Sequence, residues 1–174
     1  SISGQLTSEQ YTIIDCAFYD TCTTNHDQWI IYQSDRLTIT HSGSGMTVTG
    51  TSSDPYNLYA NKKGTSTAVQ DFEGELAVEF TATVPATNGA TFQIYDLTEP
   101  PSTSNLYQKT IDNQLVTGTS HIKFTYKDNQ IKCYVDDTLV STTSNVEFTE
   151  KFRIGFRGYV DWSIIVKNFM VYPI

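Results

Sequence analysis

The sequence contains few cysteines, and their spacing matches no common cysteine motif. Cys16, Cys22 and Cys133 are odd in number, and no C-x-x-C pair occurs. These features exclude a zinc site built on paired cysteines and a disulfide framework. Cys133 alternates with Ile131 and Val135, so we expect it to be a buried free thiol and the other two to be reduced as well. A bridge between Cys16 and Cys22 across a short loop is the alternative.

Basic residues are also scarce. There are 11 Lys and Arg against 19 Asp and Glu, which gives a formal charge of −8 and a pI near 4.7. The basic residues are scattered, whereas proteins that bind phosphate backbones cluster them. The composition therefore predicts no nucleic-acid partner.

Long apolar runs are absent. No stretch approaches the roughly 20 apolar residues that span a bilayer, so the sequence predicts no membrane span. The first residues, SISGQLTSEQ, lack the charged and apolar regions of a signal peptide. A length of 174 residues suits one β-sandwich core. We expect residues 1–174 to form a single domain excised from a larger protein.

Apolar residues do not recur at helical spacing, and alternation with period two takes its place. In the segment GELAVEFTATV, Val78 and Phe80 share one face of a predicted strand, while Glu75 and Glu79 share the other. The segment ATFQIYDL likewise turns Gln93 and Tyr95 outward. Threonine is abundant, and its β-branched side chain favours strands over helices. The sequence therefore predicts an all-β chain.

The second half of the chain has clear hairpin signals. The segment HIKFTYKDNQIKCYVDDTLVST predicts three strands with tight turns at residues 127–130 and 136–137. Phe152, Ile154 and Phe156 then form an inward set, with Arg153 and Arg157 opposite. The segments TEPPSTSN and SSDPYNLYANKKG are predicted to be loops. Strands at this spacing predict two packed antiparallel sheets with jelly-roll connections.

Three pieces of the sequence resemble concanavalin A-like and laminin-G-like sandwiches. The predicted meander HIKFTYKDNQIKCYVDDTLVST is similar to a strand, hairpin and acidic turn in those folds. The ending FRIGFRGYVDWSIIVKNFMVYP resembles their last two strands, and FYDTCTTNHDQWIIYQSDRLTITHSG resembles their opening. The resemblance implies a jelly-roll sandwich of the kind used by carbohydrate-binding modules, lectins, adhesion domains, phage tail and neck domains, and some glycoside hydrolases and lyases. It also implies a sugar site on the concave sheet face or in edge loops, and a structural calcium is common in such folds.

Two classes of enzyme with this fold, hydrolases and lyases, each require particular residues that can be looked for in the sequence. A hydrolase needs paired carboxylates, as in the E-x-D-x-x-E pattern, and that pattern is absent. Glu75 and Glu79 share a face roughly 13 Å apart by strand rise, so we interpret them as solvated outer residues. A lyase would need an Arg, a His and a Tyr to converge, and the sequence offers His121, Arg153, Arg157 and Tyr159 without the characteristic strings of such lyases.

Aromatic residues provide the strongest signal for binding. Sugars bind in water by stacking on flat rings beside a few directional polar groups. The segment RGYVDW places Tyr159 and Trp162 beside Arg157, so we predict a binding platform there; the alternative is a structural lid on the end of the core. Trp29 begins an apolar run and is predicted to be structural. The other candidate ligand-binding residues are Arg153, Tyr95, and, in a predicted loop, Tyr56 and Tyr59.

Metal ligands have no clear spacing. His26, His41 and His121 are too far apart in sequence to predict a metal triad. Acidic residues in predicted turns could provide oxygen ligands for a structural calcium, but plain turn chemistry, in which Asp bonds to the following backbone, is the default interpretation. These residues are Asp20, Asp27, Asp136, Asp137 and Asp161.

The sequence thus predicts a non-catalytic module that recognises a cell-surface glycan. We expect it to work at the cell surface, outside the cell or on a virion, as part of an adhesin, a phage tail or neck protein, or a polysaccharide-degrading enzyme. A structural or protein-interaction module is the alternative from another class, and a lyase or hydrolase is a third.

Overall fold

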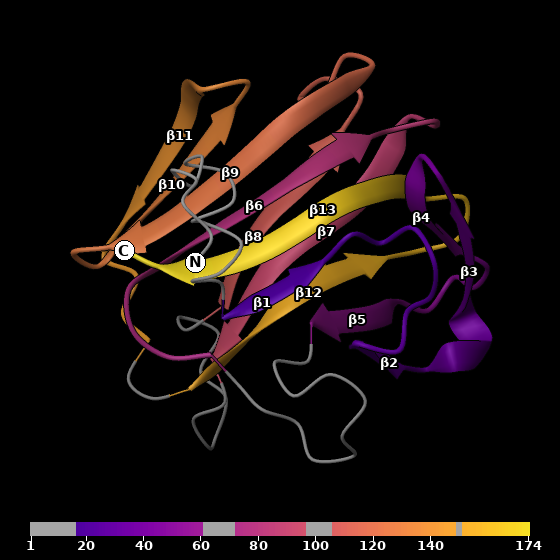
Figure 1. The fold of residues 1–174 in the computed structure, drawn as a ribbon, viewed down its shortest axis with the longest axis horizontal. Coiled ribbons are helices and arrows are strands. Elements are labelled where there is room, and N and C mark those ends of the chain that lie inside the picture. The colour runs from indigo at the N-terminus through magenta and orange to yellow at the C-terminus, as the bar shows by residue number, and fades with distance from the viewer. Residues whose placement is uncertain (1–16, 61–71, 97–105, 149–150) are drawn as a thin grey trace, which may run out of the picture.

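Two antiparallel β-sheets face each other in the computed structural model, which describes residues 17–60, 72–96, 106–148 and 151–174. Figure 1 shows them as two layers, with the larger sheet toward the viewer. The predicted all-β, two-sheet jelly-roll sandwich is confirmed. No helix in the described ranges is long and apolar enough to cross a membrane.

The larger sheet has eight strands and the smaller sheet has five. In the order of their pairing, the larger contains β11 (Thr138–Ser144), β10 (Gln130–Val135), β9 (Thr119–Lys127), β6 (Leu76–Thr83), β13 (Ser163–Pro173), β4 (Gly45–Gly50) and β3 (Leu37–Ser42), with β1 (Phe18–Asp20) also paired to β13. The smaller contains β2 (Trp29–Tyr32), β5 (Tyr56–Ala60), β12 (Phe152–Gly158), β7 (Asn88–Asp96) and β8 (Leu106–Asp112). A short 3-10 helix, η1 (Ser34–Arg36), precedes β3.

Aromatic rings fill the space between the sheets. Phe92 of β7 stacks on Phe124 of β9 with ring centroids 4.0 Å apart, and Phe80 of β6 meets Phe156 of β12 edge to face at 5.4 Å. All four side chains are buried. These contacts join the two sheets, and they place the apolar face of each predicted strand inward.

The predicted tight turns are confirmed. Asp128 and Asn129 have φ values of 51° and 55°, and Asp136 and Asp137 have 47° and 65°. Two consecutive residues in the left-handed region form the hairpin turn that matches strand twist, and Asp and Asn tolerate this region better than most residues.

The prediction that SSDPYNLYANKKG is a loop is wrong for residues 56–60. This segment is β5, which pairs with β2 on one side and β12 on the other. Pro55 directly precedes the strand, and Asn57 and Tyr59 face away from the core, so the apolar alternation is too short to be recognised. Residues 61–71 lie outside the described part of the chain.

The inward set predicted on β12 is confirmed. Phe152, Ile154 and Phe156 are buried, and the two arginines alternate with them on the opposite face. Gly155 lies between the arginines. A Cβ atom at this position would be 1.9 Å from the backbone oxygen of Leu58, so close approach of β5 requires glycine here.

The end of the core near β1 contains a buried polar group. Trp29 is 6% exposed, as its predicted structural role requires, and its Nε1–H donates to Asp20 Oδ2 at 2.7 Å. The backbone N–H of Cys22 donates to Asp20 Oδ1 at 2.8 Å. Cys22 and Cys133 are buried free thiols, and burial raises the pKa of Cys133 to about 11. Cys16, which would bridge to Cys22 in the alternative interpretation, lies outside the described residues.

We predict that Asp20→Ala lowers the free energy of unfolding by about 2–4 kcal/mol, because two buried N–H donors would lose their acceptor. Urea unfolding followed by circular dichroism measures the change. Asp27→Ala, which alters an exposed carboxylate in the same region, is the control and should change stability by less than about 0.5 kcal/mol. Equal stability of the two variants would contradict the structural role of Asp20.

Candidate functional site

A pocket of about 320 Å³ lies on the outer face of the five-stranded sheet. It combines aromatic rings, amides and two guanidinium groups from β2, β5, β7 and β12, together with one residue that follows β2. The described lining residues are Tyr32, Gln33, Asn57, Tyr59, Gln93, Tyr95, Arg153 and Arg157.

Strand register brings these side chains together. Gly155 of β12 is paired with Tyr59 of β5 and with Gln93 of β7, so all three positions face the same side of the sheet. Arg157 is paired with Asn57 and Arg153 with Tyr95. Gly155 has no side chain, so the Gln93 side chain of β7 can reach Tyr59 of β5 across it, between the two arginines.

A buried amide network holds the polar groups of the pocket in place. The Gln93 side chain is in a residue only 2% exposed, and its Nε2 donates to Asn57 Oδ1 at 3.0 Å and to the Tyr59 hydroxyl at 2.7 Å. Gln108 Nε2 in turn donates to Gln93 Oε1 at 3.3 Å. This cross-strand network fixes side-chain positions before any ligand arrives.

Each arginine lies against a tyrosine ring. Arg153 Nη1 donates to the Tyr32 hydroxyl at 2.5 Å, and its Cζ is 5.6 Å from the centre of that ring. Arg157 Cζ is 5.6 Å from the centre of the Tyr159 ring. These cation–π contacts restrict the guanidinium groups while leaving hydrogen-bonding capacity for a ligand at Arg157.

The pocket tyrosine at β5 stays protonated at neutral pH. Burial raises the pKa of Tyr59 to about 12, and the nearby positive charges of Arg153 and Arg157 only partly oppose this effect. Its hydroxyl therefore remains a neutral group within the amide network.

The pocket unites four of the seven predicted ligand-binding residues: Tyr59, Tyr95, Arg153 and Arg157. Tyr159 and Trp162 lie in the turn after β12, both partly exposed, with ring centroids 5.2 Å apart. They form a separate pair and are not among the described lining residues, although the Tyr159 ring makes a cation–π contact with Arg157. Tyr56 needs a correction. It faces inward from β5 and is 0% exposed, so it cannot contact a ligand.

Sequence reasoning missed Tyr32, Gln33, Asn57 and Gln93 as site residues. Gln93 shares the outward face of β7 with Tyr95, and Asn57 shares the outward face of β5 with Tyr59. The alternation of inward and outward residues along each strand could therefore have identified Gln93 and Asn57 as site residues. The sequence did not predict that β2, β5 and β7 lie together with β12 in one sheet. Local alternation does not specify the pairing order of strands that are distant in sequence.

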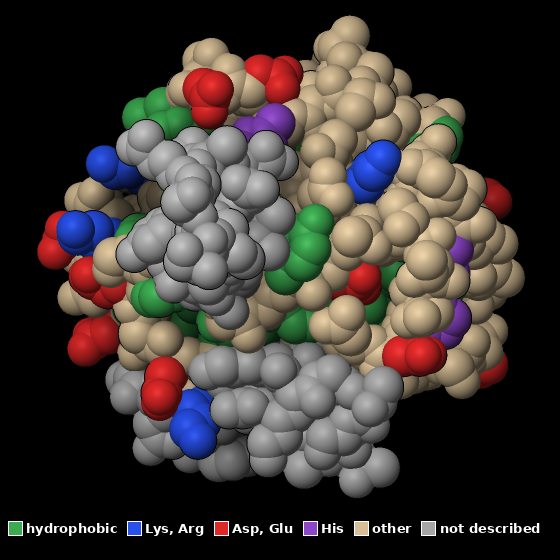
Figure 2. All heavy atoms as spheres, viewed as in Figure 1, with side chains coloured by type: hydrophobic (Ala, Val, Ile, Leu, Met, Phe, Trp, Pro, Cys, Tyr) green, Lys and Arg blue, Asp and Glu red, His purple; other side chains and the backbone are tan. Residues whose placement is uncertain are grey.

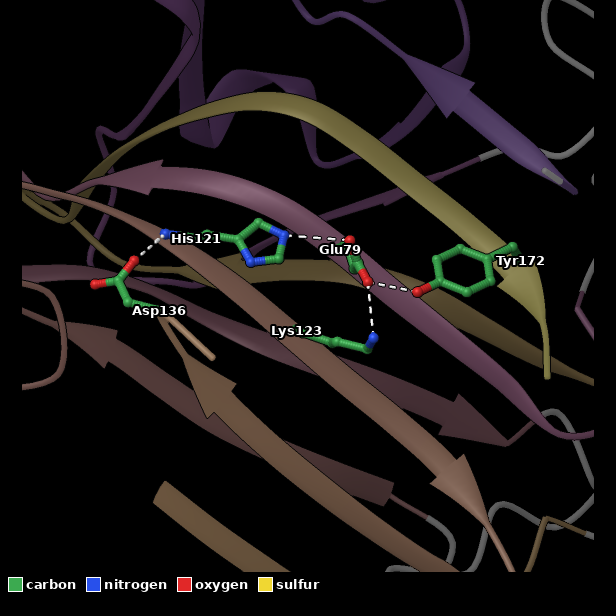
Figure 3. Close-up of polar contacts among 5 residues, drawn as sticks. All are labelled: Glu79, His121, Lys123, Asp136 and Tyr172. Atoms are coloured by element: carbon green, nitrogen blue, oxygen red, sulfur yellow. Dashed lines mark hydrogen bonds and ion pairs between the residues drawn. The ribbon is translucent and has the colours of Figure 1, made fainter. Parts of the chain in front are cut away.

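A second polar cluster lies on the outer face of the larger sheet (Figure 3). Glu79 of β6 accepts from Lys123 Nζ at 3.0 Å and contacts His121 Nε2 at 3.2 Å, both from β9. Tyr172 of β13 donates its hydroxyl to the same carboxylate. Glu79 is thus ion-paired rather than solvated, whereas Glu75 is exposed and accepts the Asp128 N–H.

The titration of Glu79 follows from this cluster. Burial alone would raise the pKa of its carboxyl, but hydrogen bonds from Tyr172 and Lys123 and the charges of Lys123 and His121 lower it below its usual range. A group held ionised in this way is a poor proton donor. His121 is also on the opposite face of the sandwich from Arg153 and Arg157, so the lyase set does not converge.

Two of the acidic residues predicted as possible calcium ligands have protein partners. Asp20 binds two N–H groups, and Asp136 accepts the backbone N–H of His121 at 2.8 Å. Within the described ranges, no group of three or more His, Cys, Asp or Glu side chains is arranged to hold a metal ion.

On the face seen in Figure 2, acidic and basic side chains are interspersed among other side chains and backbone.

Solved structures share this fold at low sequence identity. The carbohydrate-binding module CBM66 from Bacillus subtilis is 14% identical, with a TM-score of 0.57 over 85% of this chain and 97% of that one. The Emp47p carbohydrate recognition domain is 15% identical, with a TM-score of 0.58 over 90% and 95%. The Bacillus licheniformis beta-glucanase is 15% identical, with a TM-score of 0.56 over 90% and 97%.

These similarities confirm the concanavalin A-like fold. No protein-family model matches the sequence, and no curated protein matches it. Because the structural neighbours include both binding domains and a glucanase, the fold alone leaves the choice between binding and catalysis open.

We predict that Glu79→Gln lowers the free energy of unfolding at pH 7 by about 1–3 kcal/mol, because hydrogen bonds to the charged carboxylate are lost. The folded-state pKa is lowered, so this stabilisation is present above the unfolded pKa and disappears as pH falls through the folded value. The difference between wild type and variant should therefore shrink steadily below about pH 4.

Urea unfolding at a series of pH values tests this expectation. Glu75→Gln, which alters an exposed carboxylate just before the same strand, is the control and should change stability little at any pH. A Glu79→Gln effect that stays constant from pH 7 to pH 3 would show that the carboxylate charge is not responsible.

Proposed function

We propose that the chain is a non-catalytic glycan-binding module and that the pocket on the five-stranded sheet is its binding site. The observation that carries the proposal is the composition of this pocket: partly exposed tyrosine rings beside amides and guanidinium groups that are already positioned. Pyranose rings stack on aromatic faces, and their hydroxyls need directional partners.

The pocket geometry suits a small sugar segment. Its volume of about 320 Å³ is within the usual range for small-molecule sites. Tyr32 and Tyr95 stand at opposite sides of the pocket, on β2 and β7, and offer partly exposed rings. Asn57 offers a partly exposed amide between them, and the buried Gln93 holds that amide in place. We expect weak, micromolar-to-millimolar affinity, as is usual when few groups of a polar ligand are desolvated.

The absence of carboxylates supports binding over hydrolysis. None of the described residues that line the pocket is Asp or Glu. Hydrolysis of a glycosidic bond commonly requires two carboxyl groups across that bond. Glu79 is on the other sheet and is already ion-paired, and Glu75 directly precedes the same strand, β6.

The biological setting belongs to the same proposal. We place the module at a cell surface, outside the cell or on a virion, within a larger adhesin, phage tail or neck protein, or polysaccharide-degrading enzyme. The carbohydrate-binding and carbohydrate-recognition domains among the structural neighbours support the ligand class.

We predict that Tyr95→Ala weakens glycan binding by about tenfold, which corresponds to the loss of one stacking contact of about 1.4 kcal/mol. A glycan array with wild type identifies ligands, and titration calorimetry measures the variants. Trp162→Ala should leave affinity unchanged, because that ring does not line the pocket. Tyr134→Ala, on the outer face of the other sheet, is the matched control.

The opposite result for the Tyr95 and Trp162 variants would contradict the assignment of the binding site to the pocket. Loss of binding in Trp162→Ala with full binding in Tyr95→Ala would assign recognition to the turn after β12. Failure of wild type to bind any glycan would favour a structural or protein-interaction module.

A further inference from the structure

The pocket is positively charged on a protein whose formal charge is −8. Its two charged lining residues are both arginines, and the other described lining residues are tyrosines, glutamines and an asparagine. The raised pKa of Tyr59 keeps that side chain neutral. Two guanidinium groups in one pocket favour an anionic ligand over a neutral or cationic one.

No described residue forms an ion pair with Arg157. The ion pairs formed between described residues are Arg36–Asp54, His121–Glu79 and Lys123–Glu79. Arg157 Nε is buried without a hydrogen-bond partner in the described chain, and the contact of its guanidinium with Tyr159 is a ring contact that satisfies no N–H. The donors of this guanidinium are therefore uncommitted within the described structure.

Arg153 differs from Arg157 in this respect. Its guanidinium already donates to the Tyr32 hydroxyl and lies against that ring. The two arginines occupy the same face of β12, four residues apart, with Gly155 between them. Arg157 is thus the better candidate for direct contact with an anion, and Arg153 adds positive charge at the other end of the pocket.

We infer that the pocket binds an acidic sugar, with its anionic group on Arg157 and its ring against the partly exposed Tyr32 or Tyr95. This inference rests on the proposed glycan-binding function. Guanidinium groups bind carboxylates and sulfates through paired N–H donors, and such charge-assisted bonds are stronger than neutral ones. The anion would satisfy donors that the protein leaves without acceptors.

An array of matched neutral, carboxylated and sulfated glycans tests the inference with the full chain. We expect the binders to be acidic, and we expect conversion of a bound carboxylate to its methyl ester to weaken binding at least tenfold. The carboxylated and sulfated sets identify which anion is recognised. Affinity should also fall as sodium chloride rises from 50 to 500 mM, because screening weakens charge pairing.

Variants at the arginine locate the contact. Arg157→Gln should lose at least tenfold in affinity for the acidic glycan, and Arg157→Lys should recover part of the loss, since it restores charge without the planar pair of donors. Arg36→Gln, which removes an arginine that pairs with Asp54 and is not among the described lining residues, is the control. If Arg157→Gln does not fold, the ester and salt measurements on wild type still decide the question.

The outcomes separate the two proposals. Binding confined to neutral glycans, with no effect of salt or of Arg157→Gln, would overturn the acidic ligand and leave glycan binding intact. No binding to any glycan would overturn both.

Discussion

The candidate site depends on strand β12, which contributes apolar residues to the core on one face and arginines to the pocket on the other. On β12, Phe152, Ile154 and Phe156 are held in the aromatic core between the sheets. Because side chains alternate, the same anchoring fixes Arg153 and Arg157 on the outer face. A shift of one residue in register would exchange these sets, burying two charges and exposing three large apolar groups. The core therefore determines where the positive charge of the site lies.

The two faces of the sandwich use charge differently. On the larger sheet, Glu79 has Lys123, His121 and Tyr172 as partners, and the charges of this cluster balance within the protein. On the smaller sheet, Arg157 has no such partner among the described residues. Balanced charges at the first cluster stabilise the fold, whereas uncommitted donors at the second are available to a ligand.

The sequence was sufficient for the fold but only partly for the site. Alternation in GELAVEFTATV and FRIGFRG identified inward and outward faces correctly, and Asp and Asn pairs identified both tight turns. Alternation failed at β5, where five residues follow a proline and polar side chains face a pocket. Tyr56 was misplaced for the same reason. The meeting of Gln93 with Tyr59 across Gly155 depends on strand order, which is a property of the whole sandwich and not of any local pattern.

A crystal structure of the protein with a bound acidic oligosaccharide would test most directly whether the pocket on the five-stranded sheet binds an acidic sugar through Arg157. We expect ligand density in the pocket on the five-stranded sheet, with a carboxylate or sulfate within hydrogen-bond distance of the Arg157 guanidinium and a sugar ring against Tyr95 or Tyr32. Ligand density against Trp162 in the turn after β12, or beside Glu79 on the opposite face, would contradict it.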